Sequence, residues 1–221
     1  MKPKFFLAVI PIFFIILVIP FQACEPDNEN DTCECDTCEL VRKPNIYLYP
    51  ETTTQLELTL AFPLGGHIVT SIPEYGTGWN VSVDPDGIIN SEYSYLFYES
   101  VQPDVWQTAE GWIIRNADLK NFFTDNMKAY GFSDREIKDF NDYWIPRLTG
   151  HQLYAIYPQD ASIIESVIQL NFSQSPEYLL RIFYIIKGLD ELPQIKIYDP
   201  QIVNNFKREG FHVSEWGVIL W

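Results

Sequence analysis

The spacing of apolar residues changes twice along this chain, and those changes limit the folds that it can adopt. Every second residue is apolar over Gln55–Phe62, which is the period of a strand with one solvent-exposed face. Apolar residues recur at helical spacing between about 117 and 148, and runs typical of strands return after Gly150. Strands on both sides of a helical segment predict an α+β domain.

The helical segment is predicted to be an antiparallel hairpin inserted between strands. Gly131 separates two helical patterns, and Ser133 with Glu136 three positions later forms a capping box, a typical helix start. Two helices joined by three residues must fold back on each other. We therefore expect a single globular domain over residues 42–221, with a mainly antiparallel β sheet or sandwich and a helical hairpin at about 117–148.

The predicted strands are short runs rich in β-branched, aromatic and aliphatic residues. The run Leu179–Ile186 is apolar on both faces, so we expect it to be a central, buried strand. The full set of candidate strands is 45–49, 55–62, 67–72, 79–83, 93–99, 152–157, 167–172, 179–186, 194–198 and 210–217.

The first 24 residues predict export followed by lipid anchoring. Two lysines precede the apolar run Phe5–Phe21, and Ala23 comes directly before Cys24. This is the pattern of a signal peptide, and Ala23-Cys24 resembles the lipobox of bacterial lipoproteins. We expect a signal peptide at residues 1–23 and a lipid on Cys24, which would anchor the protein to the outer membrane of the bacterial cell envelope. An uncleaved signal anchor, or secretion with Cys24 unmodified, is the alternative.

Residues 24–41 are predicted to be an acidic tether between the lipid and the domain. The segment is rich in carboxylates and poor in apolar side chains, so it should stay extended. Such a stretch resembles the signal that displays some Gram-negative lipoproteins on the cell surface. Cys33, Cys35 and Cys38 lie in it, and we expect one disulfide and a leftover thiol. A thiolate metal site is the alternative, which the neighbouring carboxylates disfavour because they raise thiol pKa values.

The net charge of the chain limits the classes of molecule that it can bind. Thirty acidic residues against fifteen basic ones give a net charge of −15 at pH 7, which repels nucleic acid. Neutral sugars, cations and basic proteins remain compatible with such a surface. The common motifs of serine hydrolases, zinc proteases and nucleotide-binding loops are missing from the sequence, and we expect no metal and no cofactor.

Several segments together resemble a family of uncharacterised bacterial secreted and lipoprotein-like proteins. The family has a KP-x-IYLYPE opening and a GF-x-V-x-EWG closing motif, with a YSYLFWE block between them in which this chain has Tyr98 for Trp. The resemblance implies no particular activity, substrate or catalytic residues. The matching segments span the predicted domain and are Lys43–Glu51, Pro73–Tyr75, Gly78–Trp79, Pro85–Gly87, Tyr93–Glu99 and Gly210–Gly217.

Glu99 and Glu215 are the candidate catalytic pair. Each ends an apolar row on a predicted strand, and each has an aromatic neighbour, Tyr98 or Trp216. A carboxylate at the rim of an apolar surface can have a raised pKa, and two across a cleft are the minimum for glycoside hydrolysis. The alternative is structural, because Arg181 lies in the most apolar strand and needs a carboxylate partner.

Aromatic side chains are the candidates for binding. Tyr98 and Trp216 beside the glutamates, with Trp79 and Tyr75, could stack on sugar rings, although most tryptophans of such a domain should be core. We favour a membrane-tethered binding protein, with a carbohydrate or another envelope protein as its partner, over an enzyme. A glycan hydrolase that uses the two glutamates, or a purely structural envelope component, is the alternative.

Overall fold

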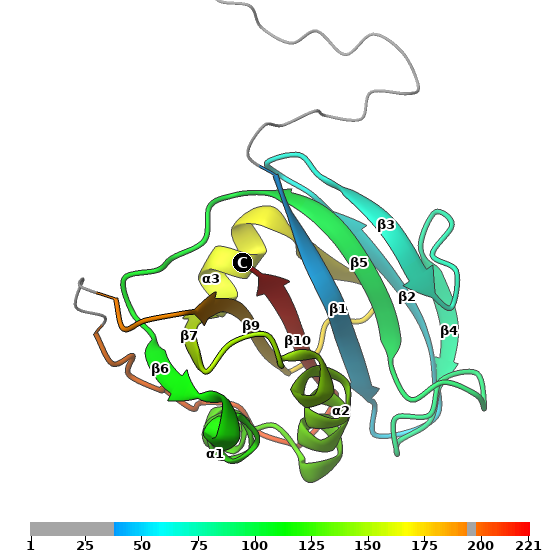
Figure 1. Cartoon of the computed structure of the whole chain (residues 1–221). Coiled ribbons are helices and arrows are strands. Elements are labelled where there is room, and N and C mark those ends of the chain that lie inside the picture. The colour runs from blue at the N-terminus through cyan, green and yellow to red at the C-terminus, as the bar shows by residue number, and fades with distance from the viewer. Residues whose placement is uncertain (1–37, 194–197) are drawn as a thin grey trace, which may run out of the picture. The chain divides into compact units, whose positions relative to one another are not determined.

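The computed structural model describes residues 38–193 and 198–221, which form two β sheets and three α helices (Figure 1). The strands are β1 Cys38–Tyr49, β2 Thr54–Ala61, β3 His67–Ile72, β4 Trp79–Val83, β5 Leu96–Pro103, β6 Trp112–Arg115, β7 Leu153–Gln159, β8 Gln169–Phe172, β9 Tyr178–Leu189 and β10 His212–Leu220. The helices are α1 Leu119–Tyr130, α2 Asp134–Trp144 and α3 Ala161–Val167, and short 3₁₀ turns at Asn116–Asp118 and Ile145–Arg147 flank the first two.

The large sheet has seven strands in the order β3-β5-β1-β10-β9-β7-β6. All of its neighbouring strands are antiparallel except β9 and β10, which run parallel. The smaller sheet has the order β4-β2-β8 and is antiparallel. The predicted α+β class with a mainly antiparallel sheet is confirmed, and the second sheet gives the domain a sandwich on one side.

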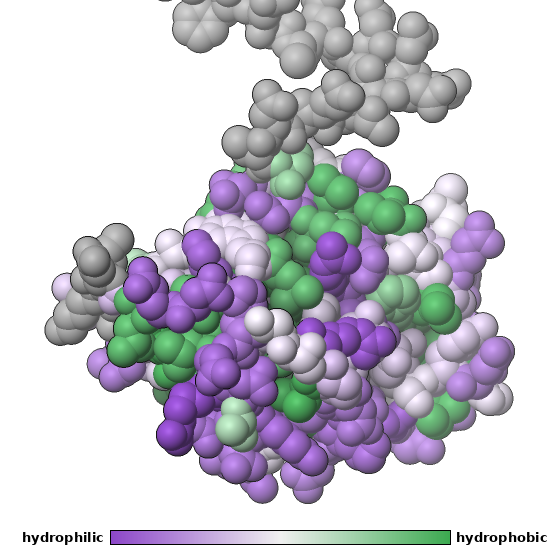
Figure 2. Space-filling view, viewed as in Figure 1, coloured by the Kyte–Doolittle hydropathy of each residue, from purple (hydrophilic) through white to green (hydrophobic). Residues whose placement is uncertain are grey.

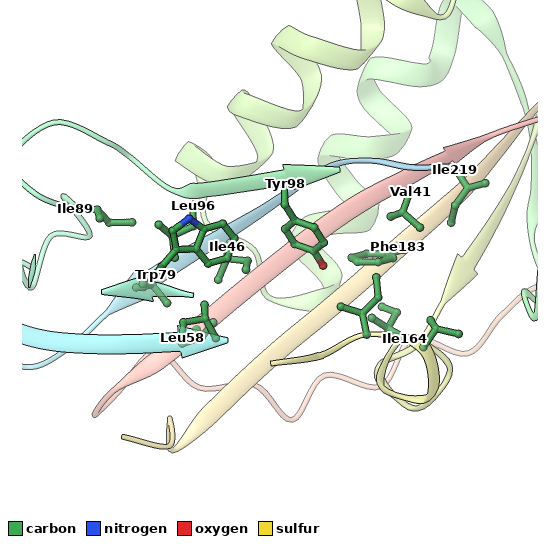
Figure 3. Close-up of a cluster of buried hydrophobic side chains, with 14 of the residues drawn as sticks. Val41, Ile46, Leu58, Trp79, Ile89, Leu96, Tyr98, Ile164, Phe183 and Ile219 are labelled. Carbon is green, nitrogen blue, oxygen red and sulfur yellow. The ribbon is translucent and has the colours of Figure 1, made fainter. Parts of the chain in front are cut away.

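Two apolar cores lie on opposite faces of the large sheet, and β9 contributes to both. Phe183 and Ile185 pack toward the small sheet and α3, whereas Ile182 and Tyr184 pack toward α1 and α2. Figure 3 shows the first core, with Phe183 among side chains from both sheets and from α3. A strand covered on both faces has no polar side to show, which explains why this segment reads as a continuous apolar run.

The helical hairpin forms as its local signals predict. Gly131 ends α1 in the left-handed region at φ 110°, a conformation that glycine adopts without strain. Ser133 caps α2, and its hydroxyl accepts from the backbone N–H of Glu136 while the Glu136 carboxylate accepts from that of Ser133. This reciprocal capping box fixes the start of α2 and thereby sets which residues of the helix face the sheet.

Strand β1 begins earlier than the predicted domain boundary. Its first residue is Cys38, and Val41 is fully buried between β5 and β10, so residues 38–41 belong to the sheet and not to the tether. Leu40 and Val41 supply enough apolar surface to join the sheet in spite of the acidic segment before them. The predicted signal peptide, the lipid site Cys24 and the cysteines Cys33 and Cys35 lie outside the described residues.

Two further elements differ from the sequence prediction. Helix α3 lies between predicted strands, and the carboxylate of Asp160 caps it by accepting from the backbone N–H groups of Ser162 and Ile163. Strand β6 lies in a segment for which no strand was predicted. Of the predicted strand 194–198, only residue 198 is described.

The surface of the domain is mixed in character. In Figure 2, hydrophilic residues dominate the lower part of the view, over α1 and α2, and hydrophobic residues gather in separate groups. Over residues 38–193 and 198–221, no helix combines the length and apolar character needed to cross a bilayer.

Candidate functional site

The carboxylate of Glu215 lies in a buried polar cluster between the large sheet and α3. Glu215 stands opposite Arg181 on the neighbouring strand and is fully buried. Its Oε2 accepts from Arg181 Nε at 2.6 Å, and its Oε1 accepts from the Tyr98 hydroxyl at 2.7 Å. Arg181 Nη1 also donates to Glu165 at 2.8 Å and to the carbonyl oxygen of Ile168 at 2.7 Å. The arrangement is a structural ion pair, as the sequence-based alternative proposes for Arg181.

The structure does not bring Glu99 and Glu215 together. Tyr98 reaches Glu215 on the small-sheet face, and successive side chains of a strand point to opposite faces, so Glu99 lies on the helix face. Glu215 is sealed from solvent and its carboxylate is engaged by two donors, whereas Glu99 is half-buried on the other side of the sheet. The predicted rows of alternating residues exist, but they line different faces, so no cleft is shared by these two carboxylates.

The predicted binding aromatics are mostly core residues. Trp79, Tyr98 and Trp216 are buried, and burial raises the pKa of Tyr98 well above its usual value, with Glu215 adding to the effect. Tyr75 is half-buried and packs edge-on against Trp79 with ring centroids 4.9 Å apart. Its hydroxyl accepts from the backbone N–H of Leu60 at 2.7 Å. Tyr75, Trp79 and Tyr98 pack between the two sheets, and Trp216 packs against Phe140 of α2 on the other face of the large sheet.

A different site forms where β1 contains a bulge. Arg42 and Asn45 of β1 stand opposite Val218 and Trp216 of β10, so β1 has one extra residue between these pairs. The same offset occurs against β5. Lys43 lies in the bulge with φ at 55°, an uncommon and strained conformation for a residue other than glycine. Bulges often redirect a side chain near a functional site, and this one directs Lys43 to the helix face.

Lys43 lines an open pocket of about 550 Å³ between the large sheet and helix α2. Residues at four-residue spacing on α2 form one wall, and β5 with the segment before it forms the other. This cavity is hereafter called the Lys43 pocket. Its lining residues are Lys43, Ile72, Glu92, Tyr93, Ser94, Tyr95, Phe97, Arg135, Asp139 and Tyr143.

Aromatic rings surround the Lys43 ammonium group. Lys43 Nζ lies 4.3 Å from the ring centroid of Phe97, 4.6 Å from that of Tyr95 and 5.3 Å from that of Tyr143. It also donates to Asn45 Oδ1 at 3.2 Å and to the Tyr95 hydroxyl at 3.3 Å. Burial lowers the pKa of Lys43 to about 8, although the nearby carboxylates act in the opposite direction.

A second buried carboxylate, Glu136, fixes the α2 wall of the pocket against the sheet. It is fully buried and accepts from the hydroxyls of Tyr49 and Ser214 at 2.8 and 2.7 Å, and from the guanidinium of Arg208. Burial alone would raise the pKa of Glu136, but Arg208, the Ser133 N–H and the Ser214 hydroxyl together hold it below its usual value. The charged pair and its hydrogen bonds therefore orient α2, and with it Arg135, Asp139 and Tyr143.

The chemistry of the pocket is that of a polar binding site with aromatic walls. Within the described parts of the chain, no three side chains of His, Cys, Asp or Glu come together in an arrangement that would hold a metal ion. The pocket instead combines ring faces with two cationic side chains, Lys43 and Arg135, and two carboxylates, Glu92 and Asp139. Such a set can stack on a flat ligand and exchange hydrogen bonds with it.

Sequence reasoning missed this pocket, although two of its parts lie in motifs that the sequence displays. Lys43 begins the KP-x-IYLYPE block, and Tyr95 and Phe97 belong to the YSYLFYE block. A lysine directly before a proline inside an apolar strand indicates an irregularity of that strand, because a strand interrupted there must bulge or end. The α2 residues could be assigned only after the packing of the hairpin was known.

Comparison with known protein families, with curated proteins and with solved structures gives no match to this chain.

Proposed function

We propose that this protein is a lipid-anchored lipoprotein of the bacterial cell envelope whose domain binds a carbohydrate in the Lys43 pocket. The leader and Cys24 support the anchoring, and the mixed aromatic and charged lining of the pocket supports the ligand class. The anchor would hold the domain at the outer membrane, where envelope and external glycans are within reach.

A carbohydrate is proposed because the rings of Tyr95, Phe97 and Tyr143 lie beside groups that can exchange hydrogen bonds. Sugar rings present C–H groups on one face and hydroxyls around their edge. Aromatic faces suit the first, and Asp139 and Arg135 on the adjacent helix suit the second. Phe97 lies on β5, and Arg135, Asp139 and Tyr143 lie on α2, so these groups are held in place before a ligand arrives.

The family resemblance is part of this proposal. Three of its segments become neighbours in space, because β5, β1 and β10 are adjacent strands at the middle of the large sheet. They supply Lys43, Tyr95 and Phe97 to the pocket, and Ser214 to the cluster behind α2. A shared site at this point would account for the motifs physically, in proteins that carry them.

Glycan binding tests the proposal directly. The full chain, solubilised in detergent, is applied to a glycan array, and hits are confirmed by calorimetry. We expect Tyr143→Ala and Asp139→Asn each to weaken binding by about tenfold, since each loses about one good polar or aromatic contact. Trp221→Ala is the matched control, because Trp221 is a partly exposed aromatic outside the pocket. No array signal, or binding that Tyr143→Ala and Trp221→Ala affect equally, would refute the pocket as a sugar site.

The lipid anchor has its own test. Cells that express the protein are fed an alkyne analogue of palmitate, and incorporation is read by gel fluorescence. Cys24→Ser should abolish labelling, and Cys33→Ser should leave it intact. Persistent labelling of Cys24→Ser would exclude Cys24 as the lipid site.

A further inference from the structure

The amine of Lys43 has an unusual environment for a lysine. Among the described residues, the ion pairs do not include Lys43, whose Nζ contacts only neutral oxygen atoms and ring faces. A lysine on a strand surface would normally extend its ammonium group into water. Here the ammonium is held over three ring faces, which attract its charge, while burial withdraws it from water.

The backbone keeps the amine there at a cost. Lys43 has a positive φ, and such strain in a non-glycine residue is found mostly at functional sites. The bulge in β1 redirects the side chain, and Pro44 after it restricts the backbone further. The pocket therefore contains a lysine whose position is fixed by both backbone and side-chain contacts.

We propose that Lys43 is a nucleophilic amine that condenses with the aldehyde group of a small ligand in the pocket, such as the open-chain form of a reducing sugar. The lone pair of the neutral amine attacks the carbonyl carbon, and the carbonyl oxygen takes up a proton to give a carbinolamine. The carbinolamine hydroxyl then leaves as water with the remaining amine proton, which leaves a carbon–nitrogen double bond. No oxidant or reductant is consumed.

Burial lowers the pKa of Lys43, so a fraction of the amine is unprotonated, and therefore nucleophilic, near neutral pH. At pH 7 an amine with a pKa of about 8 is neutral in about one molecule in ten, against about one in three thousand at a pKa of 10.5. Withdrawing a lysine from water is a common way to obtain such a nucleophile. The charged and titratable groups around Lys43 come from several elements. They are Tyr95 from the segment before β5, Glu99 from β5, Asp139 and Tyr143 from α2, and Arg147 from the turn after it, and Glu92, Tyr93 and Arg135 line the same pocket.

This inference goes beyond carbohydrate binding, because a pocket can hold a closed sugar ring with no covalent step. It rests on the proposed function only where the aldehyde is a sugar. Any small aldehyde that enters the pocket should react, so the chemistry can be tested separately from glycan recognition.

Reductive trapping tests the reactive amine. The detergent-solubilised full chain is treated with glyceraldehyde and cyanoborohydride, and peptide mapping by mass spectrometry follows each lysine over time. At pH 7 we expect Lys43 to be labelled at least about tenfold faster than Lys120, an exposed lysine on α1. The Lys43 rate should rise with pH and level off above about 8, as its amine becomes fully neutral.

The outcomes separate the two proposals. A Lys43 rate equal to or below that of Lys120, in protein whose circular dichroism shows it to be folded, overturns the reactive amine. Lys43→Arg should lose the fast label and keep the slow labelling of the other lysines. Trapping without glycan binding would refute only the carbohydrate proposal, and glycan binding without fast trapping would refute only this one.

Discussion

At the scale of single residues, the two buried ionic clusters have structural roles that differ from that of Lys43. Arg181 and Glu215 share one small volume with Tyr98, and every polar oxygen of Glu215 has a donor. The sequence showed that Arg181 needed a carboxylate partner, because an unpaired guanidinium in an apolar strand is very costly. It could not show which face of β5 carried Glu99, because that depends on the register of the neighbouring strands.

Arg181→Met tests the structural role of the ion pair. The change leaves the Glu215 carboxylate buried without its cation, so we expect the free energy of unfolding to fall by about 3–5 kcal/mol. Glu165→Gln is the matched comparison, because Glu165 contacts the same guanidinium but is about half exposed at 49%. Its loss should cost less than about 1 kcal/mol in urea denaturation. An equal fall in the free energy of unfolding in the two variants would show that burial does not determine how much each ion pair contributes to stability.

At the scale of elements, the helical hairpin was predicted and the bulge of β1 was not. Gly131, Ser133 and Glu136 act on their own neighbours in sequence, so their signals can be read locally. The bulge, in contrast, is defined by an extra residue relative to β5 and β10. Val41 and Ile46 are five positions apart yet both pack into the core below the small sheet, which a regular strand would not allow.

Ser133→Ala tests the hairpin at its capping box. The change removes the acceptor for the Glu136 backbone N–H, and we expect the free energy of unfolding to fall by about 1 kcal/mol. Because the cap also sets the start of α2, the thermal midpoint should fall with it. Ser175→Ala, at an exposed position in the loop before β9, should change the stability by less than about 0.5 kcal/mol. A Ser133→Ala protein as stable as the Ser175→Ala control would contradict a stabilising cap.

At the scale of the whole domain, the large sheet separates two apolar cores. On its helix face, the carboxylate of Glu136 links segments that are far apart in sequence. Its carboxylate connects α2 with Tyr49 of β1, Ser214 of β10 and Arg208 in the segment before β10. The sequence assigned Glu136 to the capping box alone. Its other partners are 72 to 87 residues away in sequence, so only the assembled fold brings them together.

The domain should lose stability in acid through Glu136. Its pKa is lowered in the folded state relative to the usual 4.5, so the folded protein binds the proton less readily than the unfolded chain. The stabilising contribution is therefore complete above about pH 4.5 and is lost as the pH falls through the lower folded-state pKa. The free energy of unfolding is measured by urea denaturation at several pH values and plotted against pH. Below pH 4.5 the slope of this plot should be smaller for Glu136→Gln than for the wild type. Glu74→Gln, at an exposed position, should keep the wild-type slope, and identical slopes in all three proteins would contradict this assignment.

The pairing of β1 with β10 has a consequence for how the chain acquires its structure. These strands lie side by side in the middle of the large sheet, yet Val41 pairs with Ile219, so most of the chain lies between the two partners. Closing so long a loop is entropically costly and slows folding. During synthesis, a nascent chain that has not yet reached residue 212 cannot bring β1 and β9 to either side of their common neighbour. The centre of this fold therefore forms late, after nearly all of the surrounding sequence has been made.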